Sequence, residues 1–350
     1  MKIIGLILIS LVICPVWTKF TEKQIEKYIE ETRCGEVSTE IIATGSLKGL
    51  FTLHEVAELH DILRSSYPNV VSETFKIGKT VQGNHIEGFF IGADTGDDEH
   101  KNIILIDSLH HAREFVTLSM IVQIMADSVK EVVKCSNDFY LNNKLLIVPA
   151  VNVDSVLEIA KHFQDSTWPM KQKIRKNMRQ GGDCHGIENG VDLNRNYDFE
   201  FDKIKQGDPR NPCSDEYIGT KAFSEPETRA IRDLLDQHPN IVSALNFHSY
   251  ANVWVRPYSY SHNTNQDSLK QKSERMWKLY KSFEKFARPS AARIRFGTAI
   301  ELVKYVATGE ASDWMLSKRS IFAWSPELGC DKSGCDTFYP REEAQTLTIQ

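Results

Sequence analysis

Four short apolar segments, separated by longer stretches of helical periodicity, constrain the fold of this chain most. The apolar segments have the length and composition of buried strands and span residues 102–107, 144–151, 241–247 and 321–324. Helices are expected over residues 52–65, 115–133, 225–238 and 267–287. Ser224 and Glu227 stand in capping-box spacing at the start of the third. Alternation of strands and helices predicts an α/β fold with a mixed, mostly parallel central sheet and helices on both faces.

The N-terminus has the features of a secretory signal peptide. A basic start precedes a mostly apolar run at residues 3–16, so residues 1–18 are predicted to be the signal, with a buried helix or a membrane anchor as alternatives. Residues 19–46 are polar, without a strong period, and are expected to be a short lead-in to one domain at residues 47–350, which contains no Gly/Ser-rich linker. Export would place the protein outside the cell, or in the lumen of a secretory-pathway or digestive compartment, where disulfides form.

Charge and hydropathy exclude two classes of partner. The formal net charge is -5, which argues against binding of nucleic acid along its phosphates. No apolar run of about 18 residues follows the predicted signal, so no membrane association is expected after its removal.

Chemically active side chains follow three of the predicted strands. His111 and Glu114 come after the first strand, His248 follows the third, and Glu327 follows the fourth. Ligands in open α/β sheets gather beyond the carboxyl ends of the strands. A His-x-x-Glu pair arises often by chance, and a single His at a strand end is usually structural. Together, however, these residues supply three zinc ligands and a carboxylate that can take a proton from a bound water.

An arginine among amides lies in the segment 190–197, which has the sequence GVDLNRNY. The guanidinium of Arg195 is suited to binding a carboxylate through forked hydrogen bonds. From these residues alone, a surface turn is an equal alternative.

Several motifs occur in the order found in the zinc metallocarboxypeptidases similar to pancreatic carboxypeptidases A and B. They are HARE with a following aromatic residue, GVDLNRNY, NFHSY, Tyr305 before Thr308 and Gly309, Ser312-Asp313-Trp314, and PELG. The chain resembles this family over about residues 50–340. The resemblance implies a zinc-dependent exopeptidase that acts as a monomer, carries one Zn²⁺ per chain and hydrolyses the C-terminal peptide bond of peptides or proteins.

The resemblance also assigns roles at the metal. It implies that His111, Glu114 and His248 hold the zinc, with Glu327 as general base and proton shuttle. Asp192 would orient the first of these histidines.

The substrate contacts implied by the resemblance come from four further residues. Asn194, Arg195 and Tyr305 would bind the terminal carboxylate, and Arg113 would bind a peptide carbonyl further in. Because only a chain end offers a carboxylate to Arg195, the enzyme would be an exopeptidase.

The resemblance also implies a pocket for the C-terminal side chain with Ser312 at its floor. Its wall would contain Ile300, Lys304, Ala307 and Ser325. Ser312 supplies no carboxylate, so basic C-terminal residues are expected to be poor substrates. Neutral residues are expected to be preferred, with an acidic residue as the alternative if Lys304 faces inward.

Disulfides are implied for the six cysteines outside the signal, for which 15 pairings exist. The family disulfide corresponds to Cys184 with Cys213. Cys34 with Cys135 and Cys330 with Cys335 are the guesses that remain.

The chain departs from the family at Met178, which stands where the family has an arginine that stabilises the oxyanion. A thioether cannot do so, and residues 175–179 read Arg-Lys-Asn-Met-Arg where Arg-Lys-Asn-Arg is common. One inserted residue could bring Arg179 into the vacant place, so Arg179 is predicted to be the catalytic oxyanion donor, with Arg175 as the alternative. The rest of the basic run at residues 171–179 is expected to be a solvated face.

Two functions compete with the carboxypeptidase. One is a secreted zinc-containing pseudoenzyme that binds peptides without turnover. The other is an amidase that acts on bacterial wall peptides from the same scaffold. The presence of Glu327 and Arg195 argues against the first, and the absence of a wall-binding repeat argues against the second. About 28 residues separate the predicted signal from the domain, so no zymogen with a long pro-segment is expected.

Overall fold

The centre of the protein is an eight-stranded sheet with the strand order β1-β2-β4-β3-β5-β8-β6-β7. The computed structural model describes residues 21–31, 34, 43–92, 100–135, 137–165, 174–181, 184–203, 208–260, 269–270, 273–287, 294–329 and 338–339. The predicted signal at residues 1–18 therefore lies outside the described residues. The strands are β1 (Phe75–Lys79), β2 (His85–Ile91), β3 (Asn102–Ser108), β4 (Asn143–Val148), β5 (Ile241–Ser249), β6 (Val253–Val255), β7 (Arg295–Gly297) and β8 (Phe322–Leu328).

The four central strands, β4, β3, β5 and β8, run parallel to one another. At one edge β2 and β1 continue the sheet in antiparallel fashion, and at the other edge β6 is antiparallel to β8 and parallel to β7. The predicted mixed, mostly parallel sheet is therefore confirmed. The four strands predicted from the sequence are the four central ones, because strands buried on both faces give continuous apolar runs.

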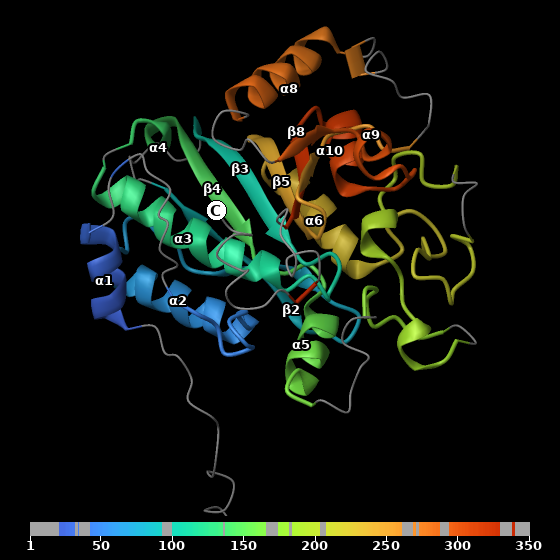
Figure 1. Cartoon of the computed structure of the whole chain (residues 1–350), viewed down its shortest axis with the longest axis horizontal. Helices are drawn as coiled ribbons and strands as arrows, with labels where there is room; N and C mark the ends of the chain where they lie inside the picture. Colours follow the sequence, from blue (N-terminus) through green and yellow to red (C-terminus); the bar gives the residue numbers. More distant parts are fainter. Residues whose placement is uncertain are drawn as a thin grey trace, which may run out of the picture.

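Helices cover both faces of the sheet, as expected (Figure 1). Figure 1 shows α2 (Leu53–Ser66) and α3 (Val116–Val133) along one side of the strands, and α6 (Pro226–Gln237), α8 (Glu274–Ala287) and α10 (Ala311–Arg319) along the other. Among the described residues, no helix combines the length and the apolar character needed to cross a membrane. The helices are α1 (Glu22–Glu31), α2 (Leu53–Ser66), α3 (Val116–Val133), α4 (Phe139–Asn142), α5 (Val153–His162), α6 (Pro226–Gln237), α8 (Glu274–Ala287), α9 (Ala299–Val303) and α10 (Ala311–Arg319).

The core is divided by the sheet into two layers. In β4, Leu145 and Ile147 pack into the layer that contains α2 and α3, whereas Leu146 and Val148 pack into the layer of α6 and α10. Successive side chains of a strand point to opposite faces, so one apolar strand contributes to both layers. This burial fixes the register of the central strands and the position of their carboxyl ends.

The predicted capping box at the start of α6 is wrong. The N-cap residue is Glu225, and no side chain caps the helix. The carboxylate of Glu227 instead accepts hydrogen bonds from the backbone N–H of Val81 at 3.0 Å and from the side-chain amide of Asn177 at 3.1 Å. Tertiary partners thus outcompete the local cap.

Helix α1 lies in the segment that was expected to be a lead-in without a period. Ile25, Tyr28 and Ile29 are buried in the first core layer. The Tyr28 hydroxyl donates to Asp127 Oδ1 of α3 at 2.8 Å. This segment therefore packs onto the α/β core.

A disulfide joins Cys34 to Cys135, next to the end of α3, as guessed from the sequence. The two cysteines are separated by 101 residues, so the bond strongly restricts the unfolded chain. Cys330 and Cys335 lie outside the described residues.

Replacing both Cys34 and Cys135 by serine is expected to lower the free energy of unfolding by about 2–4 kcal/mol, because the unfolded chain regains the entropy of the open loop. Equilibrium unfolding in urea measures this change. A midpoint and slope equal to those of the wild type would contradict it.

Candidate metal centre and substrate cavity

The carboxyl ends of β3, β5 and β8 meet at one edge of the sheet. His248, near the end of β5, is paired in the parallel ladder with Glu327 of β8. His111 and Glu114 lie in the turn between β3 and α3, beside these strand ends. The register of the central strands thus brings together the four residues predicted from the strand ends.

The side chains of His111, Glu114 and His248 are buried, and one ligand atom from each lies within 4.8 Å of the other two. His111 Nδ1 is 2.9 Å from Glu114 Oε1, and His248 Nδ1 is 3.0 Å from Glu114 Oε2. The two Nδ1 atoms are 3.2 Å apart. Two imidazole nitrogens and a carboxylate converging on one point match the donor set of a catalytic zinc, so these residues fit that ion.

Asp192 lies behind the first ligand and is fully buried. Its Oδ1 is 3.1 Å from His111 Nε2, and its Oδ2 accepts a hydrogen bond from Arg175 Nε at 2.8 Å. Burial alone would raise the pKa of Asp192, but Arg175 and His111 hold it well below its usual range. An ionised carboxylate at Nε2 keeps the proton on that nitrogen and leaves Nδ1 available to a metal.

Glu327 lines the cavity of about 290 Å³ that also exposes the three ligand residues. Burial and the nearby Glu114 carboxylate raise its pKa, and Arg175 opposes them. A carboxyl group with a raised pKa beside a metal site is suited to taking up a proton and returning it.

Arg195 does not itself line this cavity, but it contacts Tyr305 and Glu310, which do, and it is almost completely buried. Its NH2 group donates to the Tyr305 hydroxyl at 2.8 Å. Asn194 lines the cavity, and its Nδ2 lies 3.3 Å from His248 Nε2. The residues predicted to bind a terminal carboxylate are thus grouped next to the candidate metal ligands.

Arg113 lies further out. Its guanidinium covers the ring of Phe338, 4.3 Å from the ring centroid, and approaches Asp215 at 3.8 Å. Phe338 itself lines the cavity. Arg113 therefore does not line the cavity itself but contacts Phe338, which does.

Arg179 is not brought to this cluster. Its Nε donates to Glu225 Oε2 at 2.9 Å, and its side chain is 42% exposed. The guanidinium that lines the cavity is that of Arg175, whose NH1 lies 3.3 Å from His111 Nδ1. Of these two arginines, Arg175 lines the cavity and Arg179 does not.

The segment that carries Arg175 is not a solvated face over its described residues. Lys176 is buried, and its ammonium donates to the backbone carbonyls of Glu188 at 2.5 Å, Pro212 at 2.8 Å and Ser214 at 2.8 Å. Three carbonyls satisfy all three donors of the ammonium group.

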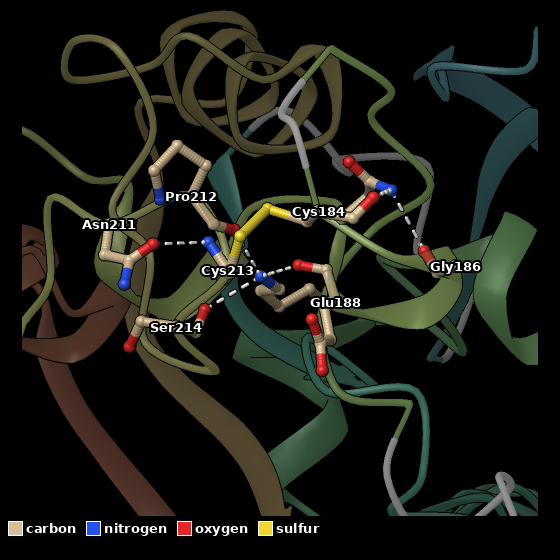
Figure 2. Close-up of a disulfide and its surroundings, with 9 residues drawn as sticks. Cys184, Gly186, Glu188, Asn211, Pro212, Cys213 and Ser214 are labelled. Atoms are coloured by element: carbon tan, nitrogen blue, oxygen red, sulfur yellow. Dashed lines mark hydrogen bonds between the residues drawn. A yellow bond between two sulfur atoms is a disulfide. The ribbon is translucent and has the colours of Figure 1, made fainter.

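The disulfide between Cys184 and Cys213 closes the same region, as the resemblance implied (Figure 2). Figure 2 shows Glu188, Pro212 and Ser214 gathered beside this bond. The disulfide and Lys176 therefore hold together the loops behind Arg175.

The pocket wall differs from the expected one. Ser325 lines the cavity, but Ile300, Lys304 and Ala307 do not, and Ser312 is buried behind Ser325, which donates to it at 3.1 Å. The Lys304 ammonium is directed to the Glu301 carbonyl at 3.0 Å. The wall is instead made by Ala251, Val255, Ala299, Val303 and Glu310.

Glu310 was missed by the sequence analysis. The only sequence signal for it is an acidic residue directly after the Thr308-Gly309 pair, in a motif whose later residues were assigned to the pocket.

Loss of one ligand should weaken metal binding. We expect chelator-stripped wild-type protein to bind one Zn²⁺ and His248→Ala to bind it at least about 100-fold more weakly, since even the partners of metal ligands contribute 10- to 100-fold. Titration with zinc against a competing chelator measures this. The control His185→Ala changes an exposed histidine and should bind like the wild type. Equal affinity of the His248→Ala protein would exclude this metal site.

Comparison with known proteins assigns most of the chain to one family. Residues 56–348 match the family model described as zinc carboxypeptidase. The chain is 27% identical over 288 residues to carboxypeptidase B of Helicoverpa zea, covering 82% of this chain and 64% of that protein. It is 30% identical over 283 residues to carboxypeptidase A1 of Mus musculus, covering 79% and 62%. These matches thus span less than two thirds of the length of either relative.

Other matches concern activity and fold. An inactive metallocarboxypeptidase of Talaromyces marneffei is 31% identical over 229 residues, covering 61% of this chain and 35% of that protein. Among solved structures, thrombin-activatable fibrinolysis inhibitor has a TM-score of 0.67 at 23% identity, covering 94% of this chain and 77% of that one. Carboxypeptidase A of Helicoverpa armigera has a TM-score of 0.64 at 23% identity, covering 94% and 78%. These structures support the fold.

Proposed function

The chain belongs to the zinc carboxypeptidase family, and on that premise we propose that it is a secreted, monomeric, zinc-dependent carboxypeptidase that hydrolyses the C-terminal peptide bond of peptides or proteins. One observation carries the proposal: a single cavity of about 290 Å³ exposes His111, Glu114, His248 and Glu327 together with Tyr305, which contacts Arg195. This arrangement supports hydrolysis of a bond next to a bound chain end.

Zinc held by His111, Glu114 and His248 would supply a Lewis acid that polarises a carbonyl and lowers the pKa of a water. Glu327 removes the proton of the attacking water and later gives it to the nitrogen of the departing residue. Its raised pKa supports this role, because a strongly acidic carboxylate would be a poor proton acceptor.

The terminal carboxylate of the substrate accepts hydrogen bonds from the guanidinium of Arg195 and from the hydroxyl of Tyr305, which are neighbours. The side chain of Asn194 is fixed beside this carboxylate site, because its Oδ1 accepts a hydrogen bond from the backbone N–H of Ala311 at 2.9 Å. Charge-assisted hydrogen bonds to a carboxylate fix the scissile bond relative to the metal ligands.

Arg175 takes the role of oxyanion donor that Arg179 was predicted to have. Asp192 holds the Nε and NH2 groups of Arg175, each 2.8 Å from Oδ2, and NH1 is directed toward the ligand atom of His111. A guanidinium fixed in this way offers a preorganised donor where negative charge develops on the carbonyl oxygen.

Secretion is supported by the N-terminal sequence and by two disulfides, Cys34–Cys135 and Cys184–Cys213. Structural disulfides persist in oxidising compartments. The extracellular space, or the lumen of a secretory or digestive compartment, is therefore the proposed location.

A peptide-binding protein without turnover is the second candidate. It is favoured by Met178, which stands where the family has an arginine, and by the similarity to an inactive relative. Activity of the purified protein decides between the two, and a panel that includes bacterial wall peptides tests the amidase.

The proposed function predicts that cleavage depends on a free chain end. We expect blocked dipeptides with a free C-terminal carboxylate to be cleaved at least about 100-fold faster than the same peptides amidated, because an amide leaves Arg195 without its charged partner. Activity should vanish with a chelator and return with zinc.

Glu327→Gln should retain zinc and lose about 100- to 10,000-fold in kcat. Equal cleavage of the amides, or near-normal kcat in Glu327→Gln, would contradict the proposal.

The second prediction separates the two arginines. Arg175→Met should lower kcat at least about 100-fold, as the loss of one oxyanion donor does. Arg179→Met removes a partly exposed ion pair and should change kcat less than about threefold. Zinc content must be measured in both proteins, because Arg175 also contacts Asp192. A large loss in Arg179→Met with a silent Arg175→Met would reverse the assignment.

A further inference from the structure

Glu310 is a carboxylate in the substrate cavity that the proposed mechanism does not use. It is only 5% exposed and lines the cavity together with Ser325 and Val303. It directly precedes α10 as the N-cap residue, but its side chain makes no capping hydrogen bond. The carboxylate is thus available for another partner.

The backbone holds Glu310 in place from both sides. The N–H of Gly309 donates to the carbonyl of Phe199 at 3.1 Å, and its own carbonyl accepts from the N–H of Tyr197 at 3.0 Å. Gly309 has a φ of +66°, and a Cβ there would lie 2.2 Å from the carbonyl oxygen of Arg195, so only glycine permits this approach. On the other side, Ala311 is tied to Asn194.

The carboxylate itself is incompletely satisfied. Its Oε1 lies 3.7 Å from NH1 of Arg195, which is an ion-pair distance without a hydrogen bond. Its Oε2 is buried and has no hydrogen-bond partner among the described residues. A buried charged oxygen without a partner is costly, so a ligand that supplies a donor would be favoured.

The rest of the wall suits a long side chain with an apolar stem. Val255, Ala299 and Val303 are apolar, and Ser325 is small. Lys304 does not line the cavity and therefore supplies no competing ammonium. A stem of methylene groups can pack on this wall while its cationic end reaches a carboxylate.

We propose that Glu310 selects substrates with a C-terminal lysine or arginine; this inference rests on the proposed carboxypeptidase function. When the terminal carboxylate of a substrate binds Arg195, two anions share that guanidinium. A neutral C-terminal residue leaves the charge of Glu310 poorly compensated, whereas a basic residue restores the balance. The preference differs from the one expected from Ser312, because Ser312 lies behind Ser325 and outside the cavity wall.

The test compares C-terminal arginine with citrulline, its neutral isostere, and with leucine. We expect kcat/KM of the wild type to be at least about tenfold higher for arginine than for either, since a buried charge pair loses more than this when one partner is removed. In Glu310→Gln the ratio of arginine to citrulline should fall toward one. A wild-type ratio near one, or a ratio unchanged by Glu310→Gln, would overturn the proposal.

Glu216→Gln is the matched control. The carboxylate of Glu216 is also 3.7 Å from Arg195, but it is half exposed and does not line the cavity. If Glu310 acted only by tuning Arg195, both variants would change the ratio alike. The proposal requires that Glu216→Gln retain the wild-type ratio.

Binding without turnover separates the two proposals. In zinc-loaded Glu327→Gln protein, calorimetry should show at least about tenfold tighter binding of an arginine-ended peptide than of its citrulline counterpart. This result without turnover by the wild type would leave the Glu310 proposal standing and reject the enzyme. Turnover by the wild type with equal binding of the arginine-ended and citrulline-ended peptides would support the enzyme and reject the Glu310 proposal. The citrulline comparison needs no substitution at Glu310 and so holds even if Glu310→Gln fails to fold.

Discussion

The site depends on the contacts that the buried carboxylate of Asp192 makes with His111, Arg175 and Asn194. One of its oxygens faces the ring of His111 and also accepts from the backbone N–H of Asn194, while the other holds Arg175. A single buried anion therefore contacts a candidate metal ligand, a residue proposed to bind the terminal carboxylate and the guanidinium of Arg175. Because Asp192 is fully buried, its charge is tolerable only when all of these partners are present. Its loss would disturb binding of metal and of substrate together.

The segment that carries Arg175 is fixed by polar groups that bind its backbone neighbours. Asn177 donates to the carboxylates of Glu225 and Glu227 and accepts from the N–H of Val191 at 2.9 Å. The ammonium of Lys176 donates to three backbone carbonyls. The hydrogen bonds of Lys176 and Asn177 together fix the position of this segment. After Asn177 the chain does not bring Arg179 to the cavity, because the Arg179 side chain is directed to Glu225.

The sequence predicted the central strands from their continuous apolar runs, the main helices from periodic apolar residues, and the grouping of the candidate metal ligands from their positions after strand ends. Helix α1 was missed because its three buried residues, including Tyr28, are spaced among charged ones. The cap of α6 was misassigned because Glu227 is drawn to Val81 and Asn177. The position of Glu310 depends on the backbone approach between Gly309 and Arg195, which no local pattern reveals.

The charges around the cavity explain why the position of Glu310 matters for the proposed function. Glu114, Glu310 and Glu327 line a small cavity together with Arg175, and Arg195 lies just behind its wall. A bound dication would compensate Glu114, and Arg175 is already paired with Asp192. Arg195 is then the nearest compensation for Glu310, and a substrate carboxylate would share it. On the proposed function, binding of the terminal carboxylate and the choice of the terminal side chain would be coupled through the guanidinium of Arg195, and a substrate that brings its own cation would relieve the competition.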